Sequence, residues 1–318
     1  MRALITGVAG FIGSHLAERL VGSGASVVGV DGFTAYYDER RKRANLEGLA
    51  GSDSFRLVEG NLRDLDLGRL LAETDVVFHL AAQPGVRRSW GQEFEVYLNE
   101  NLLAMQLLLE AVREVNVDRF VFASSSSIYG DAERLPTSEV DSPRPVSPYG
   151  VTKLAGEHLC HLYFSRFSVP VVMLRYFTVY GPRQRPDMAF CRFLDAALAG
   201  REIEIFGDGL QSRDFTFVAD AVTATIAAGS DGRPGEAYNI AGGSQATVNG
   251  VIETIGELVG RRIDVRHLAP VPGDARHTGA DTAKAAADLG YAPQTPLREG
   301  LVAQLGAASN GEAEAKPG

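Results

Sequence analysis

The chain has 318 residues, of which 45% are hydrophobic and 22% charged, so it is long enough for one large or two ordinary domains and too apolar to be mainly disordered. Its formal net charge of −9 argues against a broad surface for nucleic acid or anionic membrane, because either would need a basic field. No apolar run reaches the roughly 18 residues of a membrane span, and the start lacks a signal-peptide pattern. The two cysteines, Cys160 and Cys191, cannot form a disulfide framework. We therefore expect a cytoplasmic protein.

Short apolar runs alternate with helix-period stretches through the first half of the chain, which is the pattern of βαβ units. The expected strands are Arg2–Thr6, Val27–Val30, Phe55–Val58, Val76–Leu80, Arg119–Ala123 and Val171–Arg175. The expected helices are Ile12–Gly22, Leu65–Ala72, Glu93–Asn116 and Pro148–Phe167. This order predicts an α/β fold of the Rossmann type, a doubly wound parallel sheet whose ligands bind beyond the carboxyl ends of its strands.

The regularity weakens after Arg175, where glycine and proline become frequent, and there we expect a smaller mixed α/β lobe. Segments near 214–228 and 237–243 look strand- and helix-like, so they could return to the first sheet. We therefore predict a first domain over residues 1–177, with about 214–245 returning to it, and a second lobe over 178–213 and 246–311. Residues 312–318 have no apolar face and are expected to form a flexible tail.

A glycine-rich turn, Gly7-Val8-Ala9-Gly10-Phe11-Ile12-Gly13, joins the first expected strand to the first expected helix. Glycines there permit a tight turn and a close approach of the backbone to a pyrophosphate, whose charge the helix N-terminus attracts. Asp31 ends the next strand, close to the offset of roughly 20 residues that is typical of a ribose-binding acid. A carboxylate there would repel a 2′-phosphate, so the pattern favours NAD over NADP.

A serine run, Ser124 to Ser127, follows the strand expected at 119–123, and Ser147-Pro148-Tyr149-Gly150-Val151-Thr152-Lys153 comes later. With Ser147 as N-cap and Pro148 in the first turn, Tyr149 and Lys153 lie one turn apart on one helix face. The ammonium, like an oxidised nicotinamide, would lower the pKa of the phenol. The phenolate could then take a proton from a sugar hydroxyl while hydride leaves. An exposed Tyr–Lys pair is the alternative for such a motif by itself.

Further motifs accompany these, namely His79-Leu80-Ala81-Ala82, Ile128-Tyr129-Gly130 and Arg175-Tyr176-Phe177-Thr178-Val179-Tyr180-Gly181-Pro182. Taken together, the motif set resembles the extended short-chain dehydrogenases/reductases, in particular the NAD-dependent epimerase/dehydratase family, from residue 3 to about 300. The resemblance implies tightly bound NAD and catalytic roles for Ser125, Tyr149 and Lys153. It also implies a homodimer formed through the helices at 93–116 and 148–167, although these helices could simply cover the sheet.

The resemblance carries the cofactor-binding role to specific positions, of which Asn61 departs from the Asp that is usual there. The expected cofactor-binding residues are Gly7, Gly10, Phe11, Ile12, Gly13, Asp31, Asn61, Leu62, Leu80, Ala81, Ala82, Asn99, Ser124, Tyr149, Lys153 and Tyr176.

Ser126 and Ser127 stand where dehydratases of this family carry an acidic pair and where UDP-glucuronate decarboxylases carry a Glu. Neither serine can act as a carboxylic acid, and epimerisation needs no such acid. Gln83-Pro84-Gly85-Val86-Arg87, Thr178 and Arg185-Pro186-Asp187-Met188-Ala189 narrow the resemblance to the UDP-glucuronate 4-epimerases, which form UDP-galacturonate through a 4-keto intermediate. A UDP-glucose or UDP-N-acetylhexosamine 4-epimerase, a UDP-glucuronate decarboxylase and a non-enzymatic NAD-binding sensor remain alternatives.

The substrate side needs hydroxyl and guanidinium donors for a C6 carboxylate and a planar donor fork for the diphosphate. Arg213 and Arg276 match the family's phosphate- and ribose-binding arginines, although each could be a surface residue, and the strand at 203–207 is the expected uracil wall. The expected substrate-binding residues are Arg87, Ser125, Ser126, Ser127, Tyr149, Thr178, Arg185, Arg213 and Arg276. No His, Cys or carboxylate cluster has metal-ligand spacing, so we expect no metal, and we expect His79 to be a packed residue.

Overall fold

The computed structural model describes residues 1–269, 273 and 275–314, and its main feature is a seven-stranded parallel sheet in the order β11-β6-β5-β4-β1-β2-β3. The strands are β1 (Arg2–Thr6), β2 (Ser26–Asp31), β3 (Phe55–Glu59), β4 (Val76–His79), β5 (Arg119–Ser125), β6 (Val171–Tyr176) and β11 (Ala237–Ile240). The α/β fold class with a doubly wound parallel sheet is confirmed, and the limits of the six strands predicted from 2 to 175 differ from the observed ones by two residues at most.

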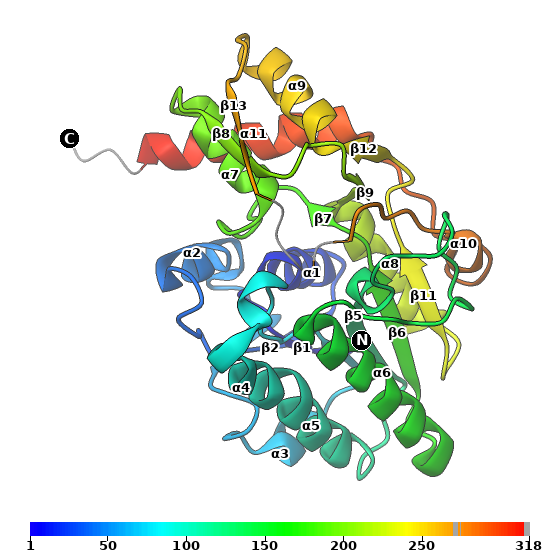
Figure 1. Cartoon of the computed structure of the whole chain (residues 1–318). Helices are drawn as coiled ribbons and strands as arrows, with labels where there is room; N and C mark the ends of the chain where they lie inside the picture. The colour runs from blue at the N-terminus through cyan, green and yellow to red at the C-terminus, as the bar shows by residue number, and fades with distance from the viewer. Residues whose placement is uncertain (270–272, 274, 315–318) are drawn as a thin grey trace.

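Helices cover both faces of this sheet (Figure 1). On one face, Ile5 of β1 packs in a core cluster with residues of α1 (Phe11–Gly22) and α8 (Val218–Ser230). On the other face, Leu4 packs with α3 (Leu67–Leu71), α5 (Ala104–Val112) and α6 (Pro148–Phe167). Adjacent residues of one strand thus enter opposite cores, because side chains alternate along a strand.

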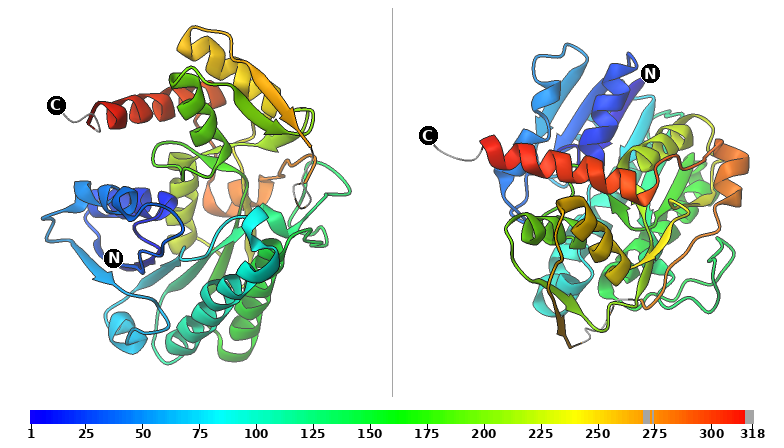
Figure 2. Two further views of the ribbon diagram at one scale, coloured as in Figure 1. Left: turned by 60° about the vertical axis from the view of Figure 1, so that its left-hand side comes forward. Right: turned by 90° about the horizontal axis from the view of Figure 1, so that it is seen from above.

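A second lobe lies over the strand ends, at the top of Figure 1, and Figure 2 shows α11 lying across it. Its own core includes Phe190, Phe215, Ile255 and Leu301. The helices are α7 (Ala189–Leu198), α9 (Val248–Val259) and α11 (Leu297–Glu314). The strands pair as β8 (Ile203–Phe206) with β13 (Val265–Leu268), β9 (Ser212–Asp214) with β12 (Gln245–Thr247), and β7 (Val179–Tyr180) with β10 (Thr216–Phe217). The chain leaves the sheet after β6 and returns to it at β11, which pairs with β6 in parallel.

The long helix expected at 93–116 is broken, which corrects the prediction. A 3₁₀ turn at Gly91–Glu93 leads to α4 (Phe94–Tyr97), then a π-helical segment at Leu98–Leu103, and α5 ends at Val112. The wider π turn buries Asn101, whose amide accepts from the backbone of Gln83 at 2.7 Å and donates to Thr152 at 3.0 Å. Such π segments are frequent near functional sites, and here it connects the helix to the loop after β4.

Two smaller differences concern helix ends. The helix expected at 65–72 is α3, which starts at Leu67 because the Asp66 carboxylate caps it by accepting from the backbone N–H of Arg69 at 3.0 Å. Helix α11 runs to Glu314, so the first residues of the tail expected over 312–318 are helical, since Ala and Glu are good helix formers. The flexibility of the tail stays a prediction. Residues 315–318 lie outside the described part of the chain. The remaining helices are α2 (Glu39–Ala44) and α10 (Ala283–Leu289).

No helix within the described residues is long and apolar enough to cross a membrane.

Candidate active site

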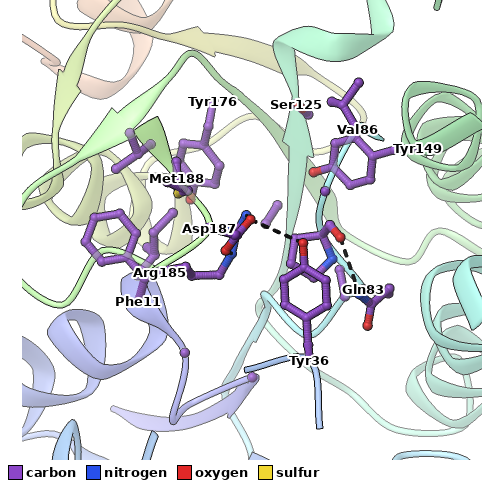
Figure 3. Close-up of a pocket in the computed structure, with 18 of the residues that line it drawn as sticks. Phe11, Tyr36, Gln83, Val86, Ser125, Tyr149, Tyr176, Arg185, Asp187 and Met188 are labelled. Carbon is purple, nitrogen blue, oxygen red and sulfur yellow. Dashed lines mark hydrogen bonds and ion pairs between the residues drawn. The ribbon is translucent and has the colours of Figure 1, made fainter. Parts of the chain in front are cut away.

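A cavity of about 710 Å³ lies between the carboxyl ends of β1, β4, β5 and β6 and the second lobe. One end begins at the glycine-rich turn after β1, and the other reaches β8 and the loop that precedes α7. Figure 3 shows Phe11, the first residue of α1, and Met188, which precedes α7, among the lining residues. This is where a doubly wound sheet places its ligands.

The glycine-rich turn gives one end of the cavity a shape that only a bare main chain can make. A Cβ added at Gly13 would lie 2.2 Å from the carbonyl oxygen of Gly7. Gly7 itself has φ +73°, and a Cβ added there would lie 2.8 Å from the backbone nitrogen of Ala81. Asp31 ends β2 and accepts from the backbone N–H groups of Ala9 at 3.0 Å and Phe33 at 2.8 Å. The bare backbone at a helix N-terminus and the fixed carboxylate fit a dinucleotide, its pyrophosphate on the turn and its ribose at Asp31.

Tyr149, Lys153 and Ser125 meet in the middle of the cavity. The hydroxyl of Ser147 caps α6 by accepting from the backbone of Gly150 at 3.1 Å, with Pro148 in the first turn, so Tyr149 lies at the helix start. Lys153, one turn later, donates its Nζ hydrogen to the carbonyl of Ala123 at 2.8 Å and lies 6.0 Å from the ring centroid of Tyr149. Figure 3 shows Ser125 beside Tyr149.

The charges at this centre differ from the prediction, because burial dominates. Burial raises the pKa of Tyr149, while the charge of Arg185 and a hydrogen bond with Ser125 act in the opposite direction without overcoming it. Burial also lowers the pKa of Lys153 to about 8. The predicted lowering of the phenol pKa is therefore wrong for the protein alone: the ammonium is held by a strand carbonyl, and both groups lose hydration.

The substrate end of the cavity is lined by long side chains. Arg185 directs Nε and Nη2 at the two carboxylate oxygens of Asp187, at 3.0 and 2.9 Å. The guanidinium of Arg87 lies 4.2 Å from the ring centroid of Phe206 in β8.

All but two of the predicted site residues line this one cavity. Asn99 does not line it; its neighbour Asn101 is the buried amide that contacts the loop after β4. Arg276 is also outside the lining, with its side chain 54% exposed and its Nη2 atom 2.7 Å from the carboxylate of Asp208. The predicted site is thus brought together in space, whereas the contact roles of its residues stay predictions.

Tyr36, Lys42 and Asp187 are polar lining residues for which no role was predicted. Tyr36 and Lys42 follow β2, and Asp187 lies two residues beyond Arg185. The signal that could have found the first two is their position after the carboxyl end of a parallel strand. For Asp187 it is an acid close in sequence to a candidate anion-binding arginine.

His79 is buried, and its Nδ1 lies 2.8 Å from the hydroxyl of Thr6, a contact within the sheet. Burial lowers the pKa of His79 to about 3. Among the described residues there is no group of three or more His, Cys, Asp or Glu side chains that could hold a metal.

Comparisons with known proteins agree along nearly the whole chain. The family model named "NAD dependent epimerase/dehydratase family" matches residues 3–241. An "uncharacterized UDP-glucose epimerase" of Bacillus subtilis is 46% identical over 307 residues, 96% of this chain and 97% of the relative. A "probable UDP-glucuronate 4-epimerase" of Rhizobium meliloti is 37% identical over 324 residues, 95% of either chain. The crystal structure of UDP-glucuronic acid 4-epimerase from Bacillus cereus, in complex with UDP-glucuronic acid and NAD, superposes with a TM-score of 0.95 at 43% identity, covering 98% of this chain and 99% of that one.

Proposed function

The chain belongs to the NAD-dependent epimerase/dehydratase family, and on that premise we propose that it interconverts UDP-glucuronate and UDP-galacturonate by inverting C4. The observation that carries the proposal is one cavity that joins Tyr149, Lys153 and Ser125 to hydroxyl and guanidinium donors suited to a sugar carboxylate. The relatives from Rhizobium meliloti and Bacillus cereus, whose names specify UDP-glucuronate, support the same substrate.

NAD is the cofactor of this family, and the glycine-rich end of the cavity fits it. Gly7 and Gly13 carry no side chain that would block the pyrophosphate, and Asp31 would accept from the ribose hydroxyls. Bound NAD supplies a hydride acceptor that later returns the hydride, together with the positive charge of its oxidised nicotinamide.

Tyr149 acts as the acid and base on the 4-hydroxyl of the sugar. Its phenolate takes the hydroxyl proton as C4 is oxidised and returns it when C4 is reduced on the opposite face. Lys153 holds a positive charge near the phenol, and the hydroxyl of Ser125 shares the same substrate oxygen. Because burial alone disfavours the phenolate, these positive charges are needed to make it accessible near neutral pH.

The C6 carboxylate must be restrained while C4 is a ketone. A 4-keto uronate is a β-keto acid, which loses CO2 once the carboxylate bond aligns with the carbonyl π system. The donors of Ser126, Ser127, Thr178 and Arg185 line this part of the cavity, and we assign them the task of holding the carboxylate out of that alignment. Thr178→Ala and Arg185→Ala should lose epimerisation or gain UDP-pentose product, and a variant that does neither would contradict the assignment.

The direct test is incubation of the purified protein with UDP-glucuronate, followed by chromatography that separates epimer, pentose and unchanged substrate. UDP-galacturonate is the expected product. The second candidate is a UDP-glucose 4-epimerase, favoured by the name of the Bacillus subtilis relative. Turnover of UDP-glucose without turnover of UDP-glucuronate would establish that candidate instead.

We also propose a homodimer that pairs the outer faces of α5 and α6. Leu103, which directly precedes α5, and Leu162 of α6 expose 44% and 49% of their surface there. An apolar groove on this face is lined by Leu102, Leu103, Gln106, Ala155, His158, Leu159 and Leu162. Sedimentation equilibrium tests this, and a monomer at micromolar concentration would refute it. A cytoplasmic location stays a prediction from the sequence.

A further inference from the structure

Asp187 lies between an arginine of the substrate end and a tyrosine of the first lobe. Besides the two hydrogen bonds from Arg185, its carboxylate accepts one from the hydroxyl of Tyr36 at 3.2 Å. Figure 3 shows the Tyr36 hydroxyl directed at Asp187 inside the cavity. Tyr36 follows β2 whereas Asp187 precedes α7, so this contact joins the two lobes across the cavity.

The Arg185–Asp187 pair is balanced in charge and only partly hydrated, with side chains 20% and 37% exposed. Burial alone would raise the pKa of Asp187, but the hydrogen bonds and charge of Arg185 hold it below the ordinary value, so the carboxylate is ionised at neutral pH. A further charged group here is Arg88, whose guanidinium is 5.0 Å from the ring centroid of Tyr36.

The two classes of sugar meet this pair differently. A guanidinium has five N–H donors, and Asp187 engages two N–H groups of Arg185, so donors remain for a ligand. A neutral hexose leaves the pair balanced. A uronate brings a second carboxylate to the same guanidinium, and the two negative charges then repel each other at close range.

We propose that Asp187 sets the preference of the cavity between carboxylated and neutral UDP-hexoses, weakening uronate binding and preserving the binding of neutral sugars. The inference rests on the proposed function for the position of the sugar C6 group beside Arg185. Asp187 acts through Arg185 and is a specificity-determining, positioning residue. Its removal leaves the full charge of Arg185 to the substrate.

The test measures the dissociation constants of UDP-glucuronate and UDP-glucose by titration calorimetry on the NAD-loaded protein. Asp187→Asn keeps the size and an oxygen acceptor but removes the charge. We expect the preference for UDP-glucuronate over UDP-glucose to rise about tenfold, the scale of one charge–charge interaction at a partly exposed site. The matched control is Asp75→Asn, because Asp75 binds Arg2 through a similar pair at the amino end of the sheet. The control should leave the preference unchanged, and an unchanged or reduced preference in Asp187→Asn would overturn the proposal.

Tyr36→Phe should change the preference in the opposite direction. It removes one hydrogen-bond donor from Asp187, so the carboxylate binds Arg185 more strongly and competes better with a uronate. The preference for UDP-glucuronate over UDP-glucose should therefore fall about twofold. This variant decides the question if Asp187→Asn does not fold, and an unchanged or raised preference in it would then refute the proposal. The proposed function would fail in a different way, namely if the unmodified protein epimerised no uronate. The ratio of the dissociation constants of UDP-glucuronate and UDP-glucose would still test the role of Asp187.

Discussion

The two ends of the cavity differ in what forms their walls, which is the main chain at one end and long side chains at the other. At the glycine-rich end the main chain makes the shape, since Gly13 has no room for a Cβ and Asp31 is fixed by two backbone N–H groups. At the substrate end, long side chains pair with one another, as Arg185 does with Asp187. The main-chain end has no room for a side chain at Gly7 or Gly13, whereas paired side chains can exchange partners when a ligand enters.

The largest expected effect lies where the two ends meet. Tyr149→Phe removes the acid and base, so kcat for UDP-glucuronate should fall about 10³-fold, within the usual range for general acid–base catalysis. The dissociation constants of NAD and UDP-glucuronate should stay within about threefold, measured by calorimetry. Turnover close to that of the unmodified protein would show that Tyr149 is not the acid and base.

One added methyl group should weaken NAD binding at the glycine-rich end. Gly13→Ala places a Cβ 2.2 Å from the carbonyl oxygen of Gly7, and the turn must shift. NAD should bind about 100-fold more weakly, since overpacking costs roughly 1–3 kcal/mol. The matched control is Gly22→Ala in the same helix, where a Cβ meets no atom within 4 Å. Equal NAD affinity in the two variants would show that the turn is not rigid.

The buried charge of Lys153, in the centre of the cavity, should lower the stability of the fold. The pKa of Lys153 is about 8 in the fold and about 10.4 in an unfolded chain, so between these values the unfolded state binds more protons and stability rises with pH. At neutral pH, Lys153→Met should raise the free energy of unfolding of the cofactor-free protein by about 2 kcal/mol while lowering kcat. The gain should shrink between pH 8 and pH 10.

Denaturant unfolding at several pH values checks this, with Lys284→Met as control. Lys284 pairs with Glu236 on the surface, so its loss should bring no gain. If Lys153→Met destabilises the fold instead, the bond from Lys153 to the carbonyl of Ala123 outweighs the burial of charge.

The smallest expected effect separates two arginines of the substrate end. Arg213 lines the cavity and Arg276 does not. Arg213→Ala should raise the KM for UDP-glucuronate about tenfold, the loss of one charged hydrogen bond, whereas Arg276→Ala should change it less than about twofold. An equal rise of KM in both variants in steady-state assays would mean that Arg276 leaves Asp208 to bind the diphosphate. That result would show directly that side chains at this end exchange partners.

The same contrast explains how much could be predicted from the sequence. The parallel sheet, the turn at Gly7 to Gly13 and the Tyr149–Lys153 pair follow from spacing along the chain, because main-chain geometry and helix periodicity are local. The contact between Tyr36 and Asp187 and the outward position of Arg276 depend on which side chains meet after folding. The broken helix near Asn101 depends on a distant loop, and the pKa of Tyr149 on burial, so no local pattern could give either.

The return of β11 to the sheet bears on the synthesis of this chain. The outer edge of β6, all of whose residues are buried in the finished fold, stays uncovered until β11 emerges roughly 60 residues later. At about 5–20 residues per second, this takes several seconds on the ribosome. An uncovered apolar strand edge invites pairing with another chain. We therefore expect the nascent chain, rather than the finished protein, to be the form most exposed to aggregation and most dependent on chaperones.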